Sequence, residues 1–193
     1  MGTVTMYLGI EIEWNRATHE AWIHQESYIT YLCSKYGLND TNPVSLPMDP
    51  NHLFGRIDEA HPDIPDLQHA YRKIIGELIY LSTCSRPNIA LTVQWLSQQC
   101  VQPEPRHFLA ARRVIRYLKG TLSLHIHFGN PNVNLSLHAF SDSNWATSPE
   151  DRVSITGYVW YFHGGTISHA SKKQTTSDVV GLAWPESPGL GLA

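Results

Sequence analysis

The sequence of 193 residues predicts an α+β fold, in which a helical segment is followed by a β-sheet segment. Apolar residues recur at helical spacing between about residues 67 and 120. From Leu122 onward the pattern changes to an alternation of apolar and polar residues, which is typical of strands. Prolines and glycines separate these stretches. The length suffices for one or two small domains with a sizeable core.

The N-terminal part is expected to begin with strands and to continue into a helix. Residues 4–13 predict one strand and residues 21–24 a returning strand. Ser27 is a candidate N-cap for a helix that runs to Tyr36, before a glycine. Residues 39–67 hold five prolines and predict an extended linker.

Three helices are expected after the linker, over about residues 67–83, 87–99 and 105–120. Proline at the start of the second and third, and glycine at the end of the third, fit known helix boundaries. The third helix has an apolar stripe on one face and basic residues on the opposite one.

Strands are expected at residues 122–128, 135–140, 155–162 and 166–170. The first two are separated by a turn signal, which favours a hairpin between them. Residues 175–193 carry two prolines and several glycines and predict a divergent, disordered tail.

Composition indicates a soluble globular protein, with 42% hydrophobic and 16% charged residues. The sequence shows no signal peptide and no apolar run of membrane-spanning length, so an intracellular location, cytoplasmic or nuclear, is expected without membrane partners. Cys33, Cys84 and Cys100 form no metal or redox motif and predict reduced thiols. The net charge of −3 gives no overall nucleic-acid signature.

Charge is nevertheless uneven along the chain. No acidic residue occurs between Pro105 and Ser141, where Arg106, Arg112, Arg113, Arg116 and Lys119 gather. These side chains are candidates for contacts to a nucleic-acid backbone, and the alternative is a solvated helix face. The pair Lys172 and Lys173 is a further candidate of the same kind.

Asp142 is the candidate metal ligand, since an aspartate at the end of a core strand can direct its carboxylate at a divalent ion. The alternative is an ordinary turn-forming aspartate. His125, His127 and His138 would share one face if the strands at 122–128 and 135–140 paired, and three imidazoles could then bind zinc. Solvent-facing histidines are the other interpretation.

Several motifs follow one another along the chain. They are Tyr7-Leu8-Gly9-Ile10-Glu11-Ile12, residues 25–31, Pro43-Val44 with Pro47-Met48, Tyr71-Arg72-Lys73-Ile74-Ile75-Gly76, Arg86-Pro87-Asn88-Ile89, residues 113–121, and the 140–174 block with Asp142 and Lys172-Lys173-Gln174. In this order and spacing they resemble the C-terminal part of the Pol polyprotein of copia-type long-terminal-repeat retrotransposons. The resemblance covers about residues 7–174.

The resemblance implies an anatomy. Residues 1–24 are similar to the last palm strand and hairpin of a reverse transcriptase, and residues 25–121 to its helical thumb and connection. Residues 122–174 resemble the N-terminal half of a ribonuclease H-like domain, which makes the expected β-sheet a truncated one. The family's intact enzyme copies RNA into DNA and degrades the RNA of the hybrid, using Mg²⁺ for both reactions.

The sequence departs from the family at two catalytic positions. It contains no Asp-Asp pair, which the family's polymerase site requires. After Gln174 the family has a helix with a catalytic glutamate, whereas here Glu186 stands between Pro185 and Pro188. Only Asp142 matches a catalytic, metal-binding position, and one carboxylate should not hold two Mg²⁺ ions productively.

The expected function is therefore that of an inactive fragment of a copia-type reverse transcriptase–ribonuclease H that retains binding of RNA–DNA hybrid or single-stranded nucleic acid. One alternative is a residual Mg²⁺-dependent ribonuclease completed by Asp178, Glu186 or a partner chain. Another is a protein-interaction module on an open sheet edge. Oligomeric state, and the choice between a decayed element and a shortened gene prediction, stay open.

Overall fold

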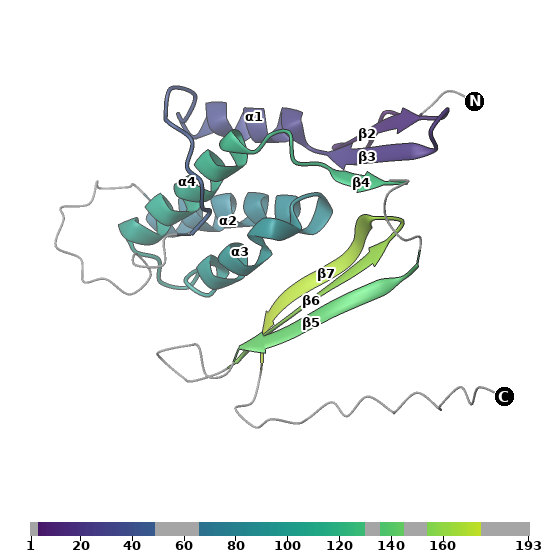
Figure 1. The fold of residues 1–193 in the computed structure, drawn as a ribbon. Helices are drawn as coiled ribbons and strands as arrows, with labels where there is room; N and C mark the ends of the chain where they lie inside the picture. Colours follow the sequence, from purple (N-terminus) through teal and green to yellow (C-terminus); the bar gives the residue numbers. More distant parts are fainter. Residues whose placement is uncertain (1–3, 49–65, 130–135, 145–153, 175–193) are drawn as a thin grey trace.

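A computed structural model describes residues 4–48, 66–129, 136–144 and 154–174 (Figure 1). Within these residues the chain forms four α-helices, one short 3₁₀ helix and two antiparallel sheets. The predicted α+β class is confirmed at this level. None of the described helices is both long and apolar enough to cross a membrane.

The first sheet combines the N-terminus with a strand from much later in the chain. Its order is β1 (Met6–Tyr7), β2 (Ile10–Asn15), β3 (Glu20–His24) and β4 (Ile126–Phe128). In the β3–β4 pair, Ile23 lies opposite Ile126. After the helices, the chain therefore adds β4 to the N-terminal sheet, where β4 lies next to β3. Figure 1 shows these strands beside α1.

The single strand expected over residues 4–13 is wrong, because a hairpin interrupts it. Leu8 and Gly9 have positive φ values of 49° and 75°, as a two-residue hairpin loop of the primed kind requires. The hydroxyl of Tyr80 donates a hydrogen bond to the Leu8 carbonyl oxygen at 2.5 Å. A Cβ at position 9 would lie 2.8 Å from that hydroxyl oxygen, so the tight contact favours glycine.

Helix α1 (Glu26–Lys35) begins without the N-cap expected from its sequence. Gln25 stands at the N-cap position. The amide and hydroxyl of Ser27 instead donate to the two carboxylate oxygens of Glu11 on β2, at 2.9 and 3.0 Å. A carboxylate at this end of the helix satisfies a free amide and complements the helix dipole.

The three predicted helices after the linker are confirmed, with one change. They are α2 (Leu67–Cys84), α3 (Ala90–Ser97) and α4 (Pro105–Gly120), and the 3₁₀ turn η1 (Pro87–Ile89) precedes α3. The second helix is therefore shorter than expected. Their apolar faces and that of α1 form the core described here, which contains Ile29, Leu32, Cys33, Leu38, Tyr71, Ile74, Ile75, Leu78, Leu81, Ile89, Val93, Leu96, Ala111, Val114, Ile115 and Leu118.

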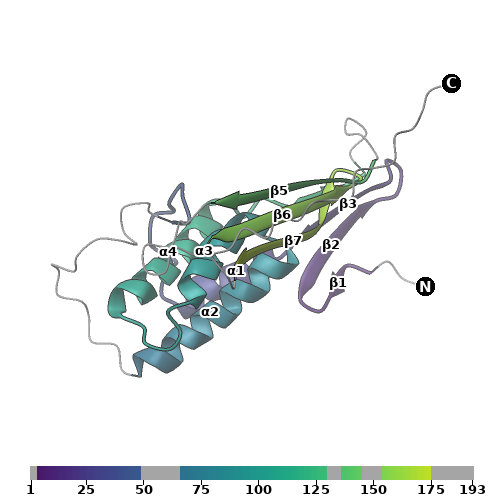
Figure 2. The same ribbon diagram turned by 90° about the horizontal axis from the view of Figure 1, so that it is seen from below.

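The second sheet is a meander of β5 (His138–Asn144), β6 (Ile155–Phe162) and β7 (Gly165–Lys173). The hairpin expected between residues 122–128 and 135–140 is wrong, since β4 pairs with β3 and β5 pairs with β6. Figures 1 and 2 show this sheet beside α3. The tail at 175–193 and most of the proline-rich linker lie outside the described residues.

Hydrogen bonds between described residues help to attach the second sheet to the rest of the molecule. On β7, the ring Nε2 of His169 lies 2.7 Å from the carbonyl oxygen of Ser82 in α2. The ammonium of Lys173 donates to Gln98 Oε1 at 3.2 Å, just after α3. The amide of Gly129, after β4, donates to the carbonyl oxygen of His163 at 2.9 Å.

Candidate functional site

The basic face of α4 holds the segment that follows α1. Arg112, Arg116 and Lys119 donate hydrogen bonds to backbone carbonyl oxygens of residues 36–42. The distances are 3.1 Å from Arg112 to Tyr36, 2.8 Å from Arg116 to Asn42, and 2.5 and 2.9 Å from Lys119 to Asn39 and Thr41. These cations therefore support the fold as well as contributing charge to the surface.

A hollow of about 350 Å³ opens between this face and the same segment. Arg112, Arg113 and Arg116 line it together with Leu38 and Thr41, and none of its described lining residues is acidic. The Nε atoms of Arg112 and Arg113 are buried without a hydrogen-bond partner. Three guanidinium groups on one concave surface create a positive potential that attracts anions.

The other predicted cations lie elsewhere. Arg106, at the start of α4, forms an ion pair with Glu104 at 3.0 Å, which offsets its charge locally. Lys172 is exposed on β7, and Lys173 beside it contacts Gln98. The structure thus groups Arg112, Arg113, Arg116 and Lys119 and leaves Arg106, Lys172 and Lys173 apart.

Asp142 lies inside β5, opposite Gly157, and not at the strand end that the sequence suggested. Its side chain is exposed and lines a hollow of about 480 Å³ between the second sheet and the η1–α3 region. Phe140 and Tyr158 line the same hollow, and Asp142 is the one acidic side chain among its described lining residues.

Magnesium-dependent hydrolysis by two ions needs several converging carboxylates. Within the described residues, Asp142 belongs to no group of three or more potential metal ligands. The side chains described here therefore do not fit a two-magnesium centre, and no hydrolytic step is derived from Asp142.

The three histidines expected on one face do not meet, because the assumed pairing of their strands is wrong. His138 on β5 stacks on Tyr161, with ring centroids 5.5 Å apart. His127 on β4 stacks on Trp22 at 4.8 Å and pairs with Glu20 at 3.0 Å. His125, just before β4, turns toward residues of β3 and α1 instead.

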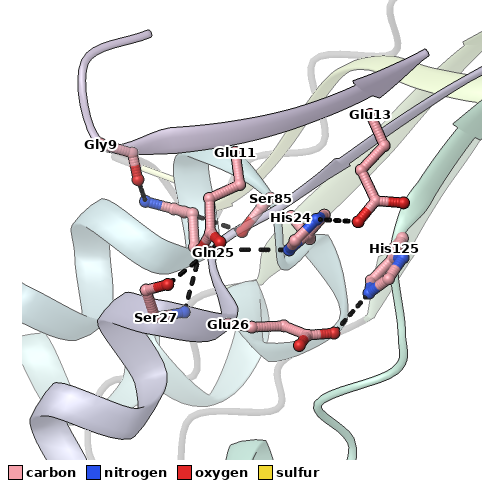
Figure 3. A network of polar contacts seen from close by, with 9 residues as sticks. All are labelled: Gly9, Glu11, Glu13, His24, Gln25, Glu26, Ser27, Ser85 and His125. Atoms are coloured by element: carbon pink, nitrogen blue, oxygen red, sulfur yellow. Dashed lines mark hydrogen bonds and ion pairs between the residues drawn. The ribbon is translucent and has the colours of Figure 1, made fainter. Parts of the chain in front are cut away.

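The partner of His125 is His24, a residue that no sequence motif singled out. Their rings stack with centroids 4.3 Å apart and an interplanar angle of 19°. Figure 3 shows the surrounding carboxylates: Glu26 Oε1 lies 2.8 Å from His125 Nε2, and Glu13 Oε1 lies 3.3 Å from His24 Nε2.

Neighbouring polar contacts anchor this cluster between β2, β3 and α2. The side-chain amide of Gln25 donates to the Gly9 carbonyl oxygen at 3.4 Å. The Ser85 hydroxyl donates to Gln25 Oε1 at 2.7 Å. Gln25 and Ser85 are both buried, so the backbone on either side of the histidine pair is held in place.

Comparison with known proteins identifies the family. The chain is 36% identical over 168 residues to the retrovirus-related Pol polyprotein from transposon RE1 of Arabidopsis thaliana. It is 30% identical over 182 residues to the corresponding polyprotein from transposon TNT 1-94 of Nicotiana tabacum. These alignments cover 87% and 90% of the chain but only 11% and 13% of the polyproteins.

A relative of more similar length is an uncharacterized mitochondrial protein of Arabidopsis thaliana, 34% identical over 181 residues. That alignment covers 91% of the chain and 70% of the relative. No protein-family profile matches the chain. No solved structure matches it either.

These matches, which run through the helical segment and both sheets, define the class of protein as retrotransposon-derived. The chain belongs to the Pol polyprotein family of copia-type retrotransposons and corresponds to a fragment of such a polyprotein.

Proposed function

We propose that the chain is a segment of the reverse transcriptase–ribonuclease H region of a copia-type Pol polyprotein, and that it binds the backbone of RNA–DNA hybrid or single-stranded nucleic acid. The order of the sequence motifs supports this placement within the polyprotein. The antiparallel meander β5–β7, which carries Asp142, agrees with the N-terminal half of a ribonuclease H-like domain. The helices α2–α4 would then belong to the thumb and connection.

The observation that carries the binding proposal is the arginine-lined hollow beside α4. Arg112 and Arg116 each donate a hydrogen bond to a backbone carbonyl, while a guanidinium has five N–H donors in all. Arg113, the third arginine of the hollow, has a buried Nε atom without a hydrogen-bond partner. Phosphate oxygens match the planar fork of arginine and can accept two parallel hydrogen bonds from it.

Binding is proposed in place of hydrolysis because of the environment of Asp142. The carboxylate stands alone among the described residues that line its hollow. Magnesium, which the family resemblance implies, would find one carboxylate among the described residues there, and the proposed binding through α4 does not need that ion.

The proposal is tested by fluorescence anisotropy with a labelled RNA–DNA hybrid and a labelled single strand, titrated at several salt concentrations. Arg113→Gln is the informative variant, since Arg113 lines the hollow and no bond from it to residues 36–42 is described. Loss of one phosphate contact should weaken binding and lower the slope of log K against log salt by about 0.7–0.9.

Lys73→Gln is the matched control, because it removes the same charge from an exposed position on α2 outside the hollow. Affinity of this variant should equal that of the unchanged protein. The proposal fails if the protein shows no affinity at low salt, or if both variants lose affinity equally.

A further inference from the structure

A second potential ligand site lies on the first sheet, apart from Asp142 and the α4 arginines. His24, Glu26 and His125 each offer one ligand atom, and these three atoms lie within 4.8 Å of one another. The residues come from the end of β3, the first turn of α1 and the loop before β4 (Figure 3). The site therefore forms only when β4 has paired with β3.

His24 supplies an independent observation that points to a ligand. The residue is 6% exposed, and its Nδ1 atom has no hydrogen-bond partner. The carboxylate oxygen that pairs with it, Glu11 Oε1, lies 4.0 Å away, beyond hydrogen-bond reach. Polar atoms of buried side chains rarely go without a partner, and coordination of an ion would give Nδ1 one.

The charge around the two imidazoles favours a cation. Glu11 and Glu13 on β2 pair with His24, and Glu26 pairs with His125. Three carboxylates thus surround two side chains that carry no charge unless protonated. A divalent ion between them would reduce the repulsion among these carboxylates.

We propose that His24, Glu26 and His125 bind a divalent transition-metal ion of the zinc type, with Glu11, Glu13 or water in the remaining position. Imidazole nitrogens together with one carboxylate suit Zn²⁺ and its neighbours in the first transition row, whereas Mg²⁺ prefers oxygen ligands. The proposal is separate from nucleic-acid binding and does not depend on it.

Coordination requires one local adjustment. Tetrahedral zinc with bonds of about 2.0–2.1 Å places its ligand atoms roughly 3.3–3.5 Å apart. The ligand atoms of His24, Glu26 and His125 lie within 4.8 Å of one another and must therefore move closer together. The stacked rings also hold their nitrogen lone pairs in nearly parallel planes, since the interplanar angle is 19°. His125 lies in a loop and is less buried than His24, so rotation of its ring toward His24 closes the site.

The test uses the whole chain and Zn²⁺, with a competing chelator dye and isothermal titration at neutral pH. One ion should bind per chain and should raise the thermal unfolding midpoint, because the ligands tie together three separate elements. His125→Ala should weaken Zn²⁺ binding by at least about tenfold. His127→Ala is the matched control: it also removes an imidazole paired with a glutamate, two residues away, but outside the cluster.

The two variants and a Co²⁺ spectrum decide the outcome. Unchanged affinity in His127→Ala together with loss in His125→Ala supports the site. Absence of stoichiometric binding, or equal loss in both variants, overturns it. Cys33, Cys84 and Cys100 are free thiols and are the competing ligands, so a thiolate-to-cobalt charge-transfer band would also overturn the proposal.

Discussion

Arg86 donates two hydrogen bonds to Thr121, one from Nη1 to the carbonyl oxygen at 3.0 Å and one from Nη2 to the hydroxyl at 2.5 Å. Arg86 is 2% exposed and stands between α2 and η1, while Thr121 is the C-cap of α4. Burial lowers the pKa of the guanidinium, and the nearby Tyr117 works against that change. The partial negative charge at the end of α4 is a favourable place for this cation.

Replacement of Arg86 by Met should therefore reduce the free energy of unfolding by about 3 kcal/mol or more, since buried polar partners are left unsatisfied. Urea denaturation followed by circular dichroism measures the change. Arg72→Met is the control, because Arg72 is exposed and donates a single hydrogen bond to the Cys100 carbonyl oxygen. If both variants lost the same free energy of unfolding, burial of Arg86 would not explain the loss of stability.

The helical core gives a second prediction. Leu78 on α2 is 0% exposed, whereas Ile79 beside it is 45% exposed. Leu78→Ala should lower the free energy of unfolding by about 2–5 kcal/mol, because it removes apolar contacts and leaves a cavity. Ile79→Ala should cost less than about 1 kcal/mol. A comparable loss for both in urea denaturation would contradict the placement of α2 in this core.

These helices could be predicted because their apolar periodicity is a local property of the sequence. Pairing of strands is not local. The alternation over residues 122–128 predicts a strand but does not say which edge it joins, and the nearest partner along the chain is the wrong one. The hairpin at Leu8 and Gly9 escapes prediction for a related reason, since alternation continues through a two-residue turn.

The same difference between local and non-local features of the sequence applies to the candidate site. The basic stripe of α4 could be predicted from helical spacing, but its contacts to residues 36–42 could not, because they join segments distant in the sequence. His24 and His125 meet only through the β3–β4 pair. Ser27 is of a residue type that favours the N-cap position. Its amide nevertheless donates a hydrogen bond to Glu11 on β2, which sequence spacing does not predict.

Stability should fall at alkaline pH because of the contacts of Glu77. The Tyr36 hydroxyl donates to Glu77 Oε2 at 2.7 Å, and Lys35 pairs with the other oxygen of that carboxylate. Burial, followed by the Glu77 contact, raises the pKa of Tyr36 far above the ordinary value of 10.0. The hydrogen bond to Glu77 raises the pKa of Lys35 above 10.5, and burial raises the pKa of Tyr28 to about 12.

Each of these groups keeps its proton in the folded chain at a pH where the unfolded chain has lost it. Their contribution to the free energy of unfolding is therefore complete below about pH 10 and is lost as the pH rises through the folded pKa values. The loss is at most about 1.4 kcal/mol per pH unit for each proton. Urea denaturation between about pH 9 and 11.5, in steps of roughly half a unit, measures this slope. Tyr36→Phe should flatten it, and Tyr158→Phe, at a 41% exposed position on β6, should not. An unchanged slope in Tyr36→Phe would refute the assignment.

Cysteine reactivity gives a fourth prediction. Cys33 is 4% exposed in the helical core, and burial raises the pKa of its thiol, with Lys119 partly opposing the shift. Burial also raises the thiol pKa of Cys84 and Cys100, but Cys33 is the least accessible of the three, so iodoacetamide at mildly alkaline pH should label Cys33 more slowly. Peptide mass spectrometry measures the three rates. In denaturant they should become equal, and equal rates in the native protein would contradict the burial of Cys33.

Alanine at Gly129 should destabilise the joint between the two sheets. Gly129 has a φ of 84°, and a Cβ there would lie 2.2 Å from the His19 carbonyl oxygen. The neighbouring atoms belong to the backbone of the β2–β3 turn and cannot move aside without shifting the strands. Backbone strain alone costs about 1–3 kcal/mol, and the clash adds to it.

The matched change is Gly76→Ala on α2, where an added Cβ meets no heavy atom within 4 Å. Alanine forms helix more readily than glycine, so this variant should gain about 1 kcal/mol in the free energy of unfolding. The same substitution thus has opposite signs at the two positions, and one set of urea denaturation curves measures both. A stable Gly129→Ala protein would mean that the strands at 20–24 and 126–128 do not approach as closely as the β3–β4 pairing requires.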